Sequence, residues 1–342
     1  MKKILLSVFA VAALASCFQN EDIVSTSDSN AIKFDSYVGN TTKAIDPSLT
    51  KATLHSFQVW GNTQGDHTIV NGTAAIVPIF TNVNVNDNSG SWAYAAEYTQ
   101  YWIDGNTYNF AAVVNGAVTK LENNLPKEIS YTADDLEDQL DLLYDEVKGV
   151  TRDTNGDSVV DFTFDHLLSK AVFTFENTTD TPADPTKPQV IYTVSNIQIA
   201  GLSSSGVYTV GAGWGTTNTS LTEAFGHIVA ESANAKVDTP ANIVEETTGK
   251  SNYERLLIPG TYNATVTCTI NLYLNGKVDK DNLADVINYS YTFDNGLELK
   301  PGYSYNFSLS AGLNDQILFN VTEVNGWTEN YPTFDQPNHD NN

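Results

Sequence analysis

The chain has 342 residues, and 41 acidic residues against 17 lysines and arginines give it a formal net charge of −24. Such a chain does not bind nucleic acid through its net field, because phosphate binding needs a basic face. Only 17% of the residues are charged, whereas Asn, Thr, Ser and Tyr are abundant, which favours strands and turns. The length suggests two domains or one large β-domain.

The amino terminus has the pattern of a secretory signal. Lys2 and Lys3 precede an apolar run from Ile4 to Leu14, which is shorter than the roughly 20 residues that span a bilayer. Leu14-Ala15-Ser16-Cys17 resembles the bacterial lipobox, so we expect residues 1–16 to be removed and Cys17 to carry lipid. The alternative is an ordinary secreted protein with a chance cysteine here.

The mature chain then begins with a tether and a strand. Removing residues 1–16 takes away two lysines and no acids, so the net charge falls from −24 to −26. Residues 17–30 are polar and aperiodic, as in a flexible tether. Residues 31–39 alternate, with Ile32, Phe34 and Ser36 on one side, which predicts a short strand. A polar loop containing Lys43 and Ala44 follows.

Further strands are predicted through the middle of the chain. Residues 53–61 alternate, and residues 74–85 do so around Pro78, which confines them to an edge or a bulge. Residues 91–114 are expected to form a hairpin around Asp104-Gly105-Asn106. A short helix at 133–139 is expected before a strand near 141–147.

The clearest strand lies at residues 263–276, where Cys268 shares the apolar face with Val266 and Ile270. Cys268 is therefore expected to be a small core residue, with a reactive thiol as the alternative. Strands do not alternate with long helices, which excludes a doubly wound α/β fold and favours β-sandwiches. We expect an all-β chain with two domains, residues 31–160 and 161–335, and a tail at 336–342.

Few residues suggest a catalytic or metal-binding site. The sequence has no zinc, nucleophile-elbow or phosphate-loop motif, and His166 is expected in the core or at a domain seam. Four residues occupy positions 1, 3, 5 and 9 of a calcium loop: Asp153, Asn155, Asp157 and Asp161. However, Ser158 replaces the usual glycine and Phe164 the usual glutamate, so a plain hairpin turn is the alternative to Ca²⁺. No other cofactor is expected.

Several segments together resemble the Bacteroidetes fimbrillin family, the lipoprotein pilin subunits of strand-exchange, type V pili. They run from the lipobox through "IKF", "LHSFQVWG" and "FTFDHLLSKAVFTF" to "LKPGYSYNFSLS" and "ILFNVTEVNGW". The resemblance implies two tandem β-sandwich domains of transthyretin-like topology, a non-enzymatic role and a place in cell-surface fimbriae.

The resemblance also implies an assembly mechanism. The precursor is anchored in the outer membrane by lipid on Cys17, and a protease cuts between Lys43 and Ala44. The strand containing Ile32 and Phe34 is then lost, and a strand from another pilin subunit replaces it. Lys43 stands where the best-known members have Arg, so the protease must accept Lys.

Other readings remain open at this point. The polar residues after Trp327 make a poor donor strand, which leaves stalk and tip positions both possible, and the ligand in adhesion would be a host glycan or protein. The alternative function is a surface glycan-binding lipoprotein whose five tryptophans stack on sugars rather than pack in the core. An enzyme has no support beyond generic acids.

Overall fold

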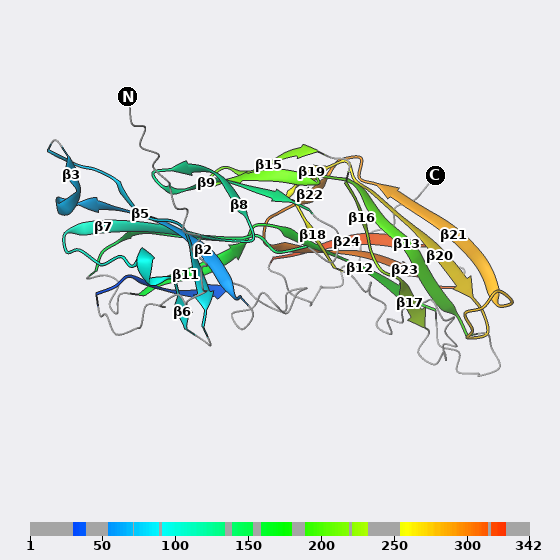
Figure 1. Ribbon diagram of the computed structural model, residues 1–342. Helices are drawn as coiled ribbons and strands as arrows, with labels where there is room; N and C mark the ends of the chain where they lie inside the picture. The colour runs from blue at the N-terminus through cyan, green and yellow to red at the C-terminus, as the bar shows by residue number, and fades with distance from the viewer. Residues whose placement is uncertain are drawn as a thin grey trace, which may run out of the picture.

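The computed structural model describes residues 30–38, 54–70, 72–88, 91–133, 139–152, 159–179, 189–218, 221–231, 254–313 and 316–325. These residues form strands β1 to β24 and two short 3-10 helices, η2 (Asp66–Thr68) and η3 (Ala96–Tyr98), which confirms the predicted all-β class. None of the helices in this part of the chain has the length and apolarity to cross a membrane. The strands build an elongated molecule with β2, β5 and β7 in one half and β20, β21 and β23 in the other (Figure 1).

The largest sheet lies in the amino-terminal half and has seven strands, with β1 at one edge and β6 at the other. Its strand pairs are antiparallel except for β1 and β11, which run parallel. In spatial order the strands are β1 (Lys33–Val38), β11 (Val159–His166), β10 (Leu143–Val150), β7 (Asn106–Val114), β2 (Ser56–Gly65), β5 (Val77–Asp87) and β6 (Trp92–Ala93).

A second sheet joins distant parts of the sequence, because β9 pairs with β14. Its order is β15 (Gly213–Asn218), β14 (Ser205–Thr209), β9 (Leu125–Thr132) and β8 (Ala117–Glu122). Two short antiparallel strand pairs lie outside the large sheets: β3 (Ile69–Val70) with β4 (Thr73–Ala74), and β19 (Gly260–Tyr262) with β22 (Leu297–Leu299).

Two sheets build the carboxyl-terminal half. One has the order β18 (Arg255–Leu257), β12 (Ser169–Asn177), β23 (Tyr303–Ala311) and β24 (Leu318–Asn325). The other has the order β16 (Leu221–Ala224), β13 (Ile191–Leu202), β20 (Thr265–Tyr273) and β21 (Leu283–Thr292), and β17 (Ile228–Glu231) also pairs with β13.

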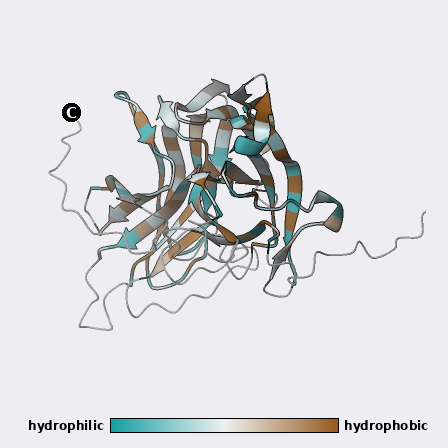
Figure 2. Ribbon diagram, turned by 90° about the vertical axis from the view of Figure 1, so that its left-hand side faces the viewer, coloured by the Kyte–Doolittle hydropathy of each residue, from teal (hydrophilic) through white to brown (hydrophobic). Residues whose placement is uncertain are grey.

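Separate apolar clusters fill these layers. One is built from residues between Ile32 and Phe164, and another from residues between Ala171 and Ala311. A third cluster, including Trp60, Ile129 and Leu168, joins the first sheet to the second. Seen along the long axis, brown apolar bands alternate with teal polar ones on many of the strands (Figure 2), as expected for strands with one buried face.

One expected element differs from the structure, and one expected domain boundary falls within a strand. The predicted hairpin at 91–114 is wrong, because β6 has two residues and pairs with β5, not with β7. The turn at Asp104-Gly105 exists, with Gly105 at φ 82°, but it leads from an irregular segment into β7. The expected division between residues 160 and 161 falls inside β11, which stays in the first sheet as far as His166.

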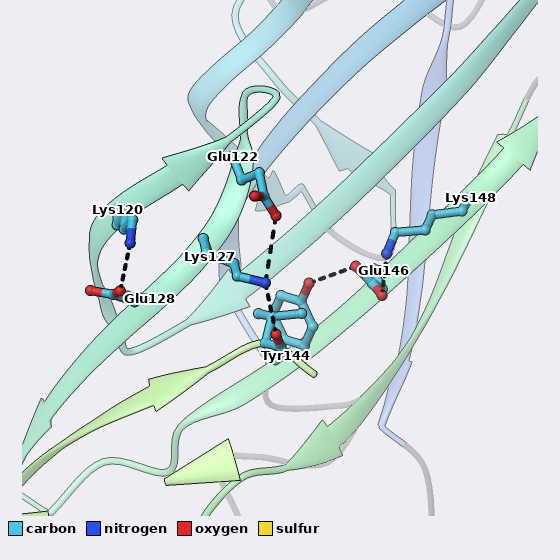
Figure 3. A network of polar contacts seen from close by, with 8 residues as sticks. Lys120, Glu122, Lys127, Glu128, Tyr144, Glu146 and Lys148 are labelled. Carbon is cyan, nitrogen blue, oxygen red and sulfur yellow. Dashed lines mark hydrogen bonds and ion pairs between the residues drawn. The ribbon is translucent and has the colours of Figure 1, made fainter. Parts of the chain in front are cut away.

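Surface ion pairs lie on β8, β9 and β10. Lys120 pairs with Glu128 at 3.0 Å, Lys127 with Glu122 at 3.5 Å and Lys148 with Glu146 at 2.6 Å (Figure 3). Each ammonium group thus has a carboxylate partner, so these lysines do not combine into a basic patch. Such exposed pairs contribute about 0–1 kcal/mol each to stability.

Candidate functional site: the seat of the first strand

β1 is an edge strand held by a distant part of the chain. It lies parallel to β11, with Lys33 opposite Val159 and Val38 opposite Phe164. Parallel neighbours need a long connection, and here the connection includes most of the first sheet. Losing β1 would therefore expose the edge of β11 without breaking any other strand pair of that sheet.

The inward face of β1 is fully seated in the core. Ile32, which directly precedes β1, is 0% exposed and Phe34 is 4% exposed, and Ser36 farther along β1 is also buried. The Phe34 ring contacts four other rings at centroid distances of 5.2–5.8 Å: Phe80, Tyr94, Phe110 and Phe162. Burying one Phe contributes about 1.5–3 kcal/mol, and each favourable ring pair about 0.5–1.5 kcal/mol more.

A clasp of polar contacts holds the start of β1 from its other side. The Ile32 N–H donates to the Gln100 carbonyl at 2.8 Å, and the Trp102 N–H donates to the Asn30 carbonyl at 3.0 Å. The Tyr94 hydroxyl donates to the Ile32 carbonyl at 2.5 Å. Burial raises the pKa of Tyr94 to about 12, so this hydroxyl keeps its proton at neutral pH.

The sequence pattern does not predict this clasp. Tyr94, Gln100 and Trp102 lie in the segment that was expected to be a regular hairpin, and Asn30 lies in the expected tether. The density of aromatic residues in "SWAYAAEYTQYW" was the available signal, but it does not reveal that the segment folds against residues 30–32.

The outward face of β1 carries a like-charge pair. Asp35 lies opposite Asp161 in the register of the two strands, and Asp161 is exposed. Like charges directly opposite each other on neighbouring strands are destabilising. β1 is therefore held by its inward face and its clasp rather than by attraction between Asp35 and Asp161 on its outward face.

Most of the other expected site residues lie outside the described part of the chain. These are Cys17, Lys43, Ala44, Asp153, Asn155 and Asp157. Asp161, the fourth calcium candidate, lies within β11. Among the described residues, no group of three or more His, Cys, Asp or Glu side chains is arranged to hold a metal ion.

A family model described as fimbrillin-like matches residues 42–327. The chain belongs to this fimbrillin-like family. The match covers most of the chain and ends at Trp327, as the sequence resemblance does, but it starts after β1. No curated protein sequence matches the chain.

Solved structures of low sequence identity are similar to this chain, and the first of them shares its fold. A fimbrial protein from Bacteroides vulgatus is 16% identical, with a TM-score of 0.58 over 87% of this chain and 100% of that one. Proposed cell adhesion proteins from Bacteroides uniformis and Bacteroides ovatus are 14% and 16% identical, each with a TM-score of 0.46. The alignments cover 87% and 88% of this chain, and 99% and 98% of those chains, respectively.

The segment "FDHLLSK" of this fimbrillin-like chain, residues 164–170, lies where β11 passes into β12. His166 Nδ1 and Asp141 Oδ2 are 2.5 Å apart, and both residues are buried. Lys170, with no exposed surface, pairs with Glu254 at 3.4 Å. Burial raises the pKa of Asp141, against the opposing effects of the charge and hydrogen bond of His166. The expected seam histidine is thus found with a hydrogen-bond partner.

The described tryptophans and Cys268 pack in or against the core of the fimbrillin-like chain. Trp60 and Trp102 are buried, Trp92 contacts the Phe57 ring at 4.9 Å, and Trp214 donates to the Leu167 carbonyl at 2.7 Å. Trp327 lies outside the described residues. Cys268 is buried on the inward face of β20, and burial raises its pKa to about 12, so it is a core residue with little thiolate character.

Proposed function

We propose that this protein is a structural subunit of cell-surface fimbriae that supports adhesion and assembles by strand exchange. In this proposal β1 is a temporary strand. Its removal leaves a groove along β11, and a strand of another pilin subunit fills that groove. The fimbrillin-like family supports the role in fimbriae, and the seat of β1 supports the exchange mechanism.

The seating of β1 carries the proposal. A strand at the edge of a sheet can leave without cutting other pairings, and β1 is such a strand. Its departure would uncover the Phe34 seat and a row of backbone groups on β11. Another extended segment can pair with these backbone groups and fill the pocket that Phe34 leaves. In such strand addition, main-chain hydrogen bonds give affinity and side-chain pockets give specificity.

Lipidation and assembly follow in order. Lipid on Cys17 holds the precursor at the outer membrane, since several acyl chains bind a bilayer stably. Cleavage between Lys43 and Ala44 separates β1 from the rest of the chain and also frees the subunit from its anchor. The fimbrium at the cell surface is then the final location.

The test uses the folded, unlipidated chain and a lysine-specific protease. We expect a nick at Lys43, loss of the fragment that contains β1, and growth of oligomers seen by light scattering. Lys43→Gln is the matched control and should stay intact at this site, with no growth of oligomers after the protease is added. A fragment that stays bound, with no oligomers after the nick, would overturn strand exchange.

Mass spectrometry of the protein isolated from its own cells tests the processing. We expect an acylated Cys17 in the precursor and a new amino terminus at Ala44 in the assembled form. A surface protein that keeps residues 18–43 in the assembled form would contradict the proposed cut.

A further inference from the structure

The strand β21 is an open edge in a half of the molecule that β1 does not reach. It has a neighbour on one side only, β20, and Figure 1 shows it along the outside of the carboxyl-terminal half. Among the described residues, no strand pairs with its other side. The edge runs for ten residues, from Leu283 to Thr292, which is long for an uncovered edge.

Side chains that normally protect an edge are nearly missing from β21. Its sequence, "LADVINYSYT", contains one charged residue, Asp285, and neither lysine nor proline. Natural edge strands usually carry such residues to prevent pairing with another chain. In a protein with a net charge of −24, a nearly uncharged edge is a place where two copies can approach closely.

The inward side chains of β21 are also incompletely covered. Tyr291 is 38% exposed, and Ile287 and Tyr289 are only partly buried. The two tyrosine rings reach across to β24, the edge strand of the facing sheet, where the Phe319 ring lies 4.8 Å from that of Tyr291 and 6.0 Å from that of Tyr289. By contrast, Phe162 and Phe164 on β11 are fully buried beneath the β1 side of the first sheet. Within the part of the chain that the structure describes, the carboxyl-terminal core is therefore incompletely covered along β21.

One hydrogen bond shows which backbone groups face the open side. The Val286 N–H donates to the carboxylate of its own neighbour, Asp285, at 2.8 Å, and so points away from β20. Backbone groups alternate in direction along an antiparallel strand. The N–H and C=O groups of Asn288 and Ser290 therefore also face the open side.

We propose that β21 pairs with the β21 strand of a second copy of this chain. The two strands run antiparallel about a two-fold axis at Asn288, which makes an isologous contact. In this register Ile287 lies opposite Tyr289 and Val286 opposite Ser290. Asp285 meets Tyr291, whose hydroxyl can donate to the carboxylate, so the only charged residue of the strand never faces its own copy.

The pairing completes what the single chain leaves open. It joins the two sheets into one continuous sheet through the backbone groups of the even-numbered residues. It also brings a second set of Ile287 and Tyr289 side chains over the exposed aromatic seam. The contact is separate from the β1 seat, so it goes beyond the proposed function and would link copies even with β1 in place.

Disulfide trapping tests the contact and its register. The unlipidated chain carries Cys17→Ser and keeps β1, which prevents strand exchange. Asn288→Cys faces itself across the axis, where Cα atoms about 5.5 Å apart suit a disulfide. Ser290→Cys is the matched control, because its two copies would lie four residues apart along the strands, about 13 Å. We expect a cross-linked dimer with Asn288→Cys alone. A monomer in both variants, or equal cross-linking in both, would overturn the proposal.

Charge substitution gives a second readout without cysteines. Val286→Glu with Ser290→Glu places like charges opposite each other twice, whereas Val286→Glu with Ser290→Lys places opposite charges there. We expect sedimentation at about 100 µM to show a dimer for the parent chain and the Glu/Lys variant, with association at least tenfold weaker for the Glu/Glu variant. Equal association of both variants, or a monomeric parent chain, would refute pairing through β21.

Discussion

Phe34 is central to the burial of β1, because four rings surround it. Phe34→Ala should lower the free energy of unfolding by about 3–5 kcal/mol, through lost transfer energy and the cavity left behind. Urea denaturation of the uncleaved chain measures this loss. Lys33→Ala, on the outer face of the same strand, should change stability by less than about 0.5 kcal/mol. Similar losses in both variants would refute the importance of the seat.

Tyr94 should make the clasp sensitive to alkaline pH. Its folded pKa of about 12 lies above its ordinary value of 10.0, so its contribution is complete below pH 10 and is lost as pH rises towards 12. The loss reaches about 2.7 kcal/mol for two pKa units. Tyr94→Phe should be about 1 kcal/mol less stable than the parent chain at pH 8.

The order of stability should then reverse at high pH. Tyr94→Phe has no proton to lose at this position, so it should become the more stable chain near pH 12. Urea midpoints of both chains between pH 8 and 12 give the comparison, in which the titration of all other tyrosines cancels. A constant difference across this range would show that Tyr94 does not couple to folding.

Individual strands could be predicted wherever one face is buried and the pattern is local. Residues 31–39 and 263–276 alternate clearly, and β1 and β20 are found there. Asn275 and Gly276, at the end of the second of these runs, take a left-handed backbone with φ of 62° and 65°, as an Asn-Gly hairpin turn requires. The parallel pairing of β1 with β11 could not be predicted, because no local pattern records a partner more than 100 residues away in the sequence.

The segment from Trp92 to Ile103 shows why the clasp was missed. Its aromatic residues suggest a strand, but Tyr94 and Trp102 are buried against residues 30–34 and β7 rather than spaced along a regular edge. Tertiary packing thus overrides strand propensity in this segment.

The like-charge pair between β1 and β11 predicts a stabilising substitution. Asp161→Asn removes the repulsion with Asp35 while keeping a side chain of similar size, so stability should rise by about 0.2–1 kcal/mol. The nicked protein should also lose its β1 fragment more slowly, as measured by size-exclusion chromatography. Asp294→Asn, in a turn outside both strands, is the control. Faster loss of the fragment in Asp161→Asn would contradict this account of the pairing.

At the scale of the whole molecule, buried charges lie where the chain passes from one half to the other. The sequence predicted a seam histidine at His166, but its partner Asp141 is 25 residues away and gave no separate signal. Lys170 and Arg255 add two buried cations, each paired with a glutamate. Buried pairs of this kind are costly when broken, because the remaining charge has lost its water and its partner.

Asp141→Ala therefore tests whether these buried polar contacts stabilise the junction between the two halves. It leaves His166 without its carboxylate and places one less anion near the buried Lys170, so we expect a loss of about 3–5 kcal/mol. Glu128→Ala breaks an exposed ion pair on β9 and should cost less than about 1 kcal/mol. Urea unfolding followed by tryptophan fluorescence and by circular dichroism measures both effects. If Asp141→Ala lost no more than Glu128→Ala, the junction would depend on the apolar cluster around Leu168 and Trp60 rather than on these charges.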